Sequence, residues 1–210
     1  MCSSDLSSGG AGAVYAWEDL RDSPVATLLG GASGDRFGDA LASAGDFDGD
    51  GATDLVVGGY AADDGATNAG AAWVFAGPLA GTLDTADALA TRLGAGSSDS
   101  AGYAVAGGGD CDGDGYDDVW VGAFNNDGGG AGAGAAYMIA GGSVGTASLG
   151  DSAILWGTTA GDRVGIAIAV GDFDADGTAD VAVGGDGGAY GETGVAWVLY
   201  GPVVGATDAD

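Results

Sequence analysis

The sequence contains no histidine and no lysine, and its four arginines stand against 31 acidic residues, which gives a formal net charge of −27. Without histidine there is no Ser-His-Asp triad or imidazole proton shuttle, and without lysine there is no Schiff base. Nucleic acids and anionic membrane surfaces are bound through lysine and arginine, so neither is expected as a partner. A compact chain of this charge repels itself, and bound cations would offset that repulsion. We therefore expect a cation-binding protein that is not an enzyme.

Cysteine and long apolar runs are also scarce. Cys2 and Cys111 are too few for a disulfide framework. No uncharged run of 18 apolar residues is present, so we predict no membrane insertion. No signal peptide is visible at the N-terminus. Residues 1–6 resemble a translated sequencing-adapter sequence, so we expect residues 1–10 to be a disordered or non-native start and residues 11–210 to fold.

Glycine and aromatic residues are plentiful, and they recur in a repeat. Three stretches align over an aspartate-rich loop, within repeats of about residues 25–76, 89–140 and 152–200. The first aspartates of the loops, 64 and 62 residues apart, are Asp46, Asp110 and Asp172. A second segment follows each loop as GAAWVFAGP, GAAYMIAGG and GVAWVLYGP, and a fourth copy, GAVYAW, precedes the first. Such internal repetition is typical of solenoids and propellers.

Each repeat contains four short strand candidates and no helix candidate. In the first repeat they cover residues 41–45, 55–59, 72–76 and 89–93, punctuated by glycine and aspartate. Four strands per repeat indicate an all-β protein, a β-propeller of four-stranded antiparallel blades, in preference to a β-solenoid with its shorter coils. Both ends of the chain fall within a repeat, so we expect a partial (truncated) propeller. The recurring aromatics are predicted to be core between blades rather than a carbohydrate-stacking row: Trp17, Trp73, Tyr137 and Trp197.

The three loops carry the candidate chemistry. Each has carboxylates at its first, third, fifth and ninth residues and glycine at its sixth. Alternate carboxylates on a tight loop converge on one point, and Ca²⁺ takes six to eight oxygen ligands at about 2.3–2.6 Å. The backbone carbonyl of the seventh residue would add an oxygen. We predict three Ca²⁺ sites, with the ligands Asp46, Asp48, Asp50, Ala52 and Asp54; Asp110, Asp112, Asp114, Tyr116 and Asp118; and Asp172, Asp174, Asp176, Thr178 and Asp180.

An EF-hand and a metal-free acidic turn both fit the loops less well. An EF-hand needs a bidentate glutamate at position 12, where this chain has Val57, Val121 and Val183 in strand candidates. Solvated acidic turns without a metal would leave four carboxylates within nine residues unneutralised, three times over. Mg²⁺ demands stricter geometry and holds its waters, so Ca²⁺ is preferred.

The combined pattern resembles the FG-GAP repeats of the integrin α-subunit β-propeller and of bacterial proteins built from them. The FG element is Phe37-Gly38, replaced by Ala101-Gly102 and Val164-Gly165 in the next repeats. The GAP element reads Gly58-Gly59-Tyr60, Gly122-Ala123-Phe124 and Gly184-Gly185-Asp186, without the proline. The resemblance implies a seven-bladed propeller with calcium in the hairpin loops between the first and second strands of each blade. It also implies that the sequence repeat is offset from the blade, and that partners bind the opposite face.

The expected function is a calcium-binding FG-GAP module that serves binding or adhesion, outside the cell or at its surface. Its expected partners are a protein or glycan ligand and the remaining blades of a longer chain. The alternative is an accessory propeller of an extracellular hydrolase whose catalytic domain is absent from this chain.

Overall fold

The computed structural model describes residues 2–3, 10–19, 23–151, 153–187, 193–205 and 207–209. These residues form strands and two single-turn 3-10 helices, η1 (Thr85–Asp87) and η2 (Leu149–Asp151), so the predicted all-β class is confirmed. No helix within them is long and apolar enough to cross a bilayer. Of the first ten residues only Cys2, Ser3 and Gly10 are described, and the expectation for this start stays a prediction.

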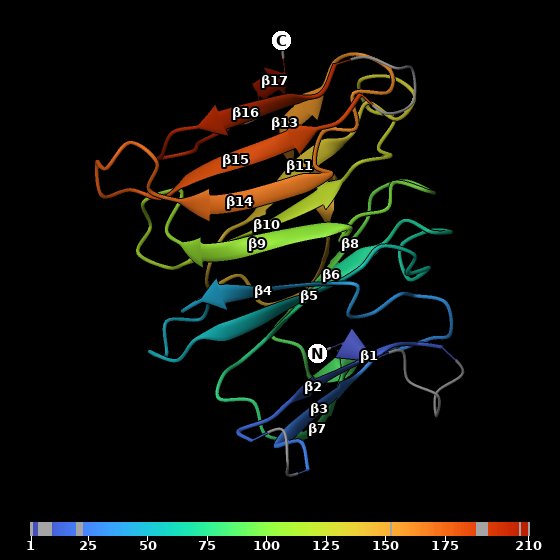
Figure 1. Cartoon of the computed structure of the whole chain (residues 1–210), viewed down its shortest axis with the longest axis vertical. Helices are drawn as coiled ribbons and strands as arrows, with labels where there is room; N and C mark the ends of the chain where they lie inside the picture. The colour runs from blue at the N-terminus through green and yellow to red at the C-terminus, as the bar shows by residue number, and fades with distance from the viewer. Residues whose placement is uncertain are drawn as a thin grey trace.

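The strands form four sheets that follow one another along the molecule in an open row (Figure 1). The N-terminal sheet contains β1 (Cys2–Ser3), β2 (Ala13–Ala16), β3 (Ala26–Leu29) and β7 (Gly81–Asp84). Blade 1 contains β4 (Ala40–Gly45), β5 (Asp54–Gly59), β6 (Ala71–Phe75), β8 (Ala90–Leu93) and β12 (Gly145–Ser148). Blade 2 contains β9 (Ala104–Gly109), β10 (Asp118–Ala123), β11 (Ala135–Ile139), β13 (Ala153–Gly157) and β17 (Thr207–Ala209). Blade 3 contains β14 (Ala167–Gly171), β15 (Asp180–Gly185) and β16 (Val195–Leu199).

The sheet order confirms the predicted offset between sequence repeat and blade. The loop of residues 46–54 joins β4 to β5, which pair with each other in one sheet. The same holds for the loop between β9 and β10 and for the loop between β14 and β15. Blades 1 and 2 each have the four predicted antiparallel strands, whereas blade 3 has three strands among the described residues. The open row of blade-like sheets agrees with the predicted partial β-propeller.

A fifth strand in each of the first two blades was not predicted. The segment between the third and fourth strands of blade 1, β7, pairs in parallel with β3 of the preceding sheet. In the same way β12 pairs with β8 of blade 1, and β17 pairs with β13 of blade 2. Each connection thus adds a strand to the outer edge of the sheet before it. Neighbouring sheets are therefore joined by backbone hydrogen bonds as well as by the apolar side chains packed between them.

Apolar side chains fill the spaces between consecutive sheets. Trp73 and Phe75 pack with Phe37 between the N-terminal sheet and blade 1. Tyr137 lies between blades 1 and 2, and Trp197 packs partly buried between blades 2 and 3. The predicted aromatic core is confirmed at these positions. Trp17 differs, because it lies beyond the end of β2, half-exposed against Tyr15, with 5.5 Å between ring centroids.

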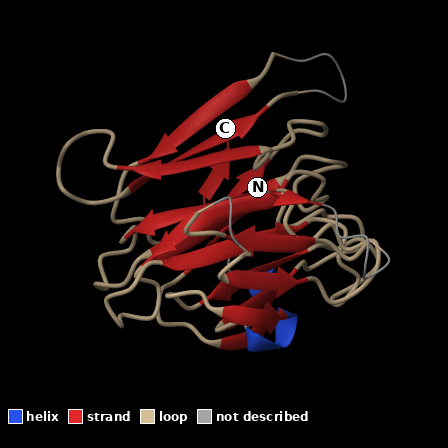
Figure 2. Cartoon of the chain, turned by 60° about the horizontal axis from the view of Figure 1, so that its bottom comes forward, coloured by secondary structure: helices blue, strands red, loops and turns tan. Residues whose placement is uncertain are grey.

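The glycines of the FG and GAP elements allow neighbouring backbones to touch. A Cβ at Gly58 of β5 would collide with the carbonyl oxygen of Gly102, which leads into blade 2. One blade further on, a Cβ at Gly122 would collide with the carbonyl of Gly165. The inner strands β4, β9 and β14 accordingly pack side by side. Figure 2 shows the result, a stack of strands with loops gathered at both ends.

A buried arginine holds the added strand of blade 1. Arg92 of β8 is only 6% exposed. Its guanidinium donates to the carbonyl of Gly145 (2.7 Å), the carbonyl of Ser143 (3.2 Å) and the hydroxyl of Ser143 (2.8 Å). These bonds fix the start of β12 against the outer edge of β8.

We expect Arg92→Ala to lower the free energy of unfolding by about 2–3 kcal/mol, because the packing of a buried side chain and its hydrogen bonds to Gly145 and Ser143 are lost together. Denaturant titration would measure this, and amide exchange in β12 should quicken. Arg36→Ala, at an exposed arginine, is the matched control, and an equal loss there would contradict the assignment.

Candidate metal sites in the blade loops

The three acidic loops lie at one end of their strands, at the left of Figure 1. We call residues 46–54 loop 1, residues 110–118 loop 2 and residues 172–180 loop 3. Each loop turns the chain from the innermost strand of a blade into the second strand. The strands therefore hold all three loops along the same edge of the molecule.

Side-chain to backbone hydrogen bonds shape every loop in the same way. In loop 1 the Asp46 carboxylate accepts from the backbone N–H of Gly51, Asp48 accepts from Asp50, and Asp50 accepts from Ala52. The corresponding bonds recur in loops 2 and 3, and all nine measure between 2.7 and 3.1 Å. Short polar side chains that accept from residues two to five positions on are typical of tight turns. The aspartates therefore stabilise the conformation of the loop in addition to giving it negative charge.

The structure brings three carboxylates together in each loop. Their oxygen atoms lie within 4.8 Å of one another in the groups Asp46, Asp48 and Asp50; Asp110, Asp112 and Asp118; and Asp172, Asp174 and Asp180. Two oxygens that each lie about 2.4 Å from one calcium ion are at most about 5 Å apart, so the groups fit a single ion. The fourth predicted carboxylate of each loop lies outside its group: Asp54, Asp114 and Asp176. The carbonyls of Ala52, Tyr116 and Thr178 stay predicted ligands.

The ninth residue of each loop is a buried carboxylate with a second role that the sequence analysis missed. Asp118 is 0% exposed and accepts from the backbone N–H groups of Cys111 (2.8 Å) and Gly141 (2.9 Å). Asp54 bonds Phe47 and Gly77 in the same manner, and Asp180 bonds Phe173 and Gly201. Burial raises the pKa of Asp54 above its ordinary value and that of Asp118 to about 6. The sequence signal was a glycine recurring at a near-constant distance after the aspartate.

The carboxylates gathered in each loop offer a negatively charged site that a cation could occupy. Two of the arginines bind elsewhere, since Arg163 pairs with Asp186 at 3.0 Å and Arg92 donates to carbonyls. The loops offer hard oxygen donors, which is the donor set that Ca²⁺ prefers and that soft transition metals do not. The residues present therefore fit calcium.

Cys111 takes the place of an aromatic core residue. It is the second residue of loop 2, where loop 1 has the fully buried Phe47. The indole N–H of Trp120 donates to its sulfur at 3.4 Å, and burial raises the pKa of the thiol to about 11. A protonated, buried thiol is a poor nucleophile. Phe173, in the same position of loop 3, is 51% exposed.

Aromatic side chains line up at the opposite end of the strands. Tyr60 follows β5, Tyr103 precedes β9 and Phe124 follows β10, with ring centroids 5.6 Å apart in the first pair and 4.5 Å in the second. The guanidinium of Arg163, which precedes β14, lies 4.8 Å from the Phe124 ring centroid. We call these four residues the aromatic row. It runs from blade 1 to blade 3.

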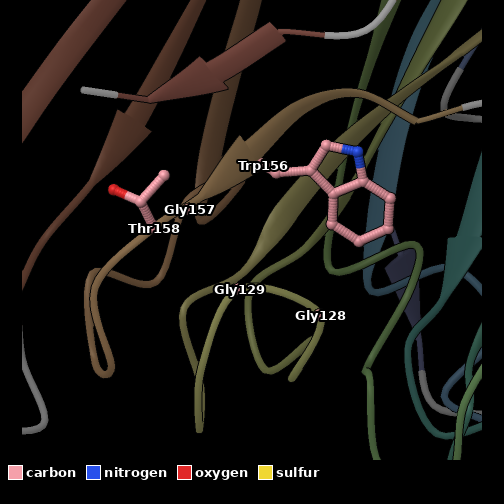
Figure 3. Close-up of a pocket in the computed structure, with 5 residues that line it drawn as sticks. All are labelled: Gly128, Gly129, Trp156, Gly157 and Thr158. Carbon is pink, nitrogen blue, oxygen red and sulfur yellow. The ribbon is translucent and has the colours of Figure 1, made fainter.

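A cleft of about 430 Å³ opens at the same end of blade 2. Figure 3 shows the residues that line it, with the indole of Trp156 on the side of the Gly128–Gly129 turn and Thr158 just after the end of β13. Its remaining lining is the backbone of three glycines, Gly128, Gly129 and Gly157. The cleft offers an aromatic face and peptide groups, and its lining residues carry no acid or base.

Comparison with known proteins identifies the repeat. Residues 37–75, which include Phe37, loop 1 and β4 to β6, match the FG-GAP repeat family model. A 93-residue stretch is 41% identical to "Integrin alpha pat-2" of Caenorhabditis briggsae. That stretch is 43% of this chain and 7% of the relative's length. The predicted resemblance is confirmed: one repeat of the chain matches the FG-GAP family model, and the chain is similar to an integrin α over part of its length.

The fourth residue of loop 3 is strained. Ala175 has φ +65°, where loops 1 and 2 have Gly49 and Gly113 at φ +78° and +85°. A left-handed conformation costs an L-residue roughly 1–2 kcal/mol, partly offset by the entropy that glycine loses on folding. We expect Ala175→Gly to raise the free energy of unfolding by about 0.5–1 kcal/mol. Thermal melting would measure the gain.

The reverse change at the matching position is the control. A Cβ at Gly113 would meet only Pro202 within 4 Å, at an ordinary 3.8 Å, so Gly113→Ala adds backbone strain without a clash. It should lower the melting temperature. If both variants shift stability in the same direction, strain at this residue is not the cause.

Proposed function

We propose that this FG-GAP repeat chain is a calcium-binding propeller module that serves binding or adhesion outside the cell. The observation that carries the calcium assignment is the gathering of three carboxylates within 4.8 Å in every one of three loops. One such cluster on a protein surface is ordinary. Three in the same register, each folded by the same hydrogen bonds, indicate a common ligand.

In each loop, some residues would be ligands of the ion and others stabilise the conformation of the loop. In loop 2, Asp110 and Asp112 would hold the ion, with Asp118 at the buried side and the Tyr116 carbonyl adding a neutral oxygen. Glycine at the sixth position, with φ +94° at Gly115, makes the turn that lets the carboxylates face inward. A bound Ca²⁺ would supply two positive charges beside three carboxylates.

Two points support an extracellular location: the calcium affinity expected of the loops, and the similarity to an integrin α subunit. Open, largely exposed loops of this kind suit the 10⁻⁴–10⁻³ M affinities of extracellular calcium modules. The relative carries the name of an integrin α subunit, and this chain would share its setting. No histidine or lysine is available for catalysis, which favours a binding module over an enzyme.

The aromatic row is the proposed contact surface for a protein or glycan partner. Tyr103 is 40% exposed at its centre. Tyrosine offers large contact area at low cost in conformational entropy, together with a hydroxyl. The row lies at the strand end away from the acidic loops, so an approaching ligand would avoid their charge.

Calcium should stabilise the folded chain, because an ion that binds only the native state adds RT ln(1 + [L]/Kd). At 100 times Kd this is about 2.7 kcal/mol for one site. We expect chelation to lower the melting temperature markedly and calcium, not magnesium, to restore it. An identical melting curve with and without chelator would contradict the assignment of calcium to the loops.

Single substitutions localise the ions. Asp48→Ala, Asp112→Ala and Asp174→Ala should each reduce the number of bound calcium ions by one, counted by native mass spectrometry. Asp186→Ala, an acidic residue away from the loops, is the control and should leave the count unchanged. A variant of a loop aspartate that keeps all ions would contradict the ligand assignment.

The contact surface can be tested without knowing the ligand in advance. The calcium-loaded chain is screened on glycan and extracellular-protein arrays, and any hit is retested with Tyr103→Ala. We expect affinity to fall at least tenfold, because truncation of a central aromatic residue that dominates an interface costs about 2 kcal/mol or more. Tyr200→Ala is the matched control, because Tyr200 is 59% exposed and follows β16 at the metal-loop end. Equal losses in both variants would place the contact elsewhere.

A further inference from the structure

We infer that Asp117 couples the metal sites of loops 1 and 2, so that an ion in loop 2 raises the affinity of loop 1. This inference rests on the proposed calcium binding. Asp117 is the eighth residue of loop 2, a position that was not a predicted ligand, and its contacts reach across to the next blade.

Asp117 holds the first ligand residue of the neighbouring loop. Its carboxylate accepts from the backbone N–H of Asp46 at 2.8 Å, and its own N–H donates to the carbonyl of Asp46 at 3.3 Å. Both backbone polar groups of Asp46 are thereby fixed by blade 2. A hydrogen bond to an ionised carboxylate is stronger and more directional than a neutral one. Asp117 is a positioning residue, because it acts on the ion through Asp46.

Tyr116 makes a second contact between the same two loops. A Cβ at Gly49 would lie 2.6 Å from the Tyr116 ring, so this ring covers the fourth residue of loop 1 closely. The segment 116–118 therefore serves both loops. The carbonyl of Tyr116 and the carboxylate of Asp118 are ligand groups of loop 2, whereas the side chains of Tyr116 and Asp117 contact loop 1. An ion that orders this segment from one side also fixes the side chains on the other.

Loops 2 and 3 lack the side-chain hydrogen bond that Asp117 makes between loops 1 and 2. Its backbone bonds are the same, since Ala179 N–H donates to the Asp110 carbonyl at 3.3 Å, as Asp117 does to Asp46. The residue at the eighth position is alanine, however, and carries no acceptor. A cleft of about 360 Å³ lies between these two loops, lined by Asp110, Asp172 and Ala179 among others. Loops 1 and 2 are therefore joined by the Asp117 side chain, whereas loops 2 and 3 have no corresponding side-chain hydrogen bond.

This difference predicts unequal coupling. Loops 1 and 2 should bind calcium with positive cooperativity, and loop 3 should bind independently of loop 2. Because coupling between binding sites is reciprocal, an ion in loop 1 must favour loop 2 by the same factor.

The test measures calcium binding by calorimetry and native mass spectrometry in a background of Asp174→Ala, which leaves loops 1 and 2. There we expect two cooperative ions, and Asp117→Ala should weaken one of them about tenfold and remove the cooperativity. Asp117→Asn keeps an oxygen that accepts from Asp46 N–H but loses the charge, so it should keep the cooperativity and weaken binding by less than Asp117→Ala does. If Asn weakens binding as much as Ala, the effect is long-range attraction and the inference is overturned. It is also overturned if Ala binds like the parent.

Two controls separate this inference from folding and from the proposed function. In a background of Asp48→Ala and Asp112→Ala only loop 3 remains, and Asp117→Ala should leave its affinity unchanged. A loss there means that the variant is misfolded and that Asp117 is a general structural residue, which overturns the inference. If the unaltered chain binds no calcium at all, the proposed function itself fails. Calcium binding by three independent sites would refute only the coupling.

Discussion

The buried aspartate at the end of each loop is the interaction on which the blades depend. Asp54, Asp118 and Asp180 accept backbone N–H groups from the start of their own loop and from the turn after the third strand. One carboxylate thus joins three segments of a blade in a place that water does not reach. A buried charge is costly unless hydrogen bonds and opposite charge compensate it. The hydrogen bonds are internal, and they hold the start of the loop and the turn after the third strand against the same carboxylate.

The four antiparallel strands of a blade could be predicted from sequence because they bury side chains. Val, Trp, Phe and Tyr recur at fixed places in β5, β6, β10 and β11, and these strands are buried almost throughout. The added strands β7 and β12 have exposed residues with the sequences GTLD and GTAS. Only their backbones are engaged, in parallel pairing with the sheet before. Apolar periodicity reports burial, so a strand held by backbone hydrogen bonds and a distant arginine leaves little trace in it.

The candidate metal sites, like the strands, could be predicted from the sequence only in part. Which residues form each loop follows from the repeat, and three of the four predicted carboxylates gather in every case. Which three differs, with Asp50 included in loop 1 and the ninth residue included in loops 2 and 3. The contacts of Asp117 were out of reach, because the eighth position holds Thr53, Asp117 and Ala179 in turn and has no pattern within one repeat. Its role depends on which blade lies beside it, and that is a property of the assembled row of sheets.

The strands also determine how the two ends of the molecule can influence each other. An inner strand such as β4 has six residues, which span about 20 Å at roughly 3.3 Å per residue. The Debye length at physiological ionic strength is about 8 Å, so a charge bound in the loops would act weakly on the aromatic row. Blades 1 and 2 touch closely at the far end, where Gly58 of β5 meets the carbonyl of Gly102, which precedes β9, beside Tyr60 and Tyr103. Any influence of calcium on a ligand at the far end therefore passes through the packing of one blade on the next.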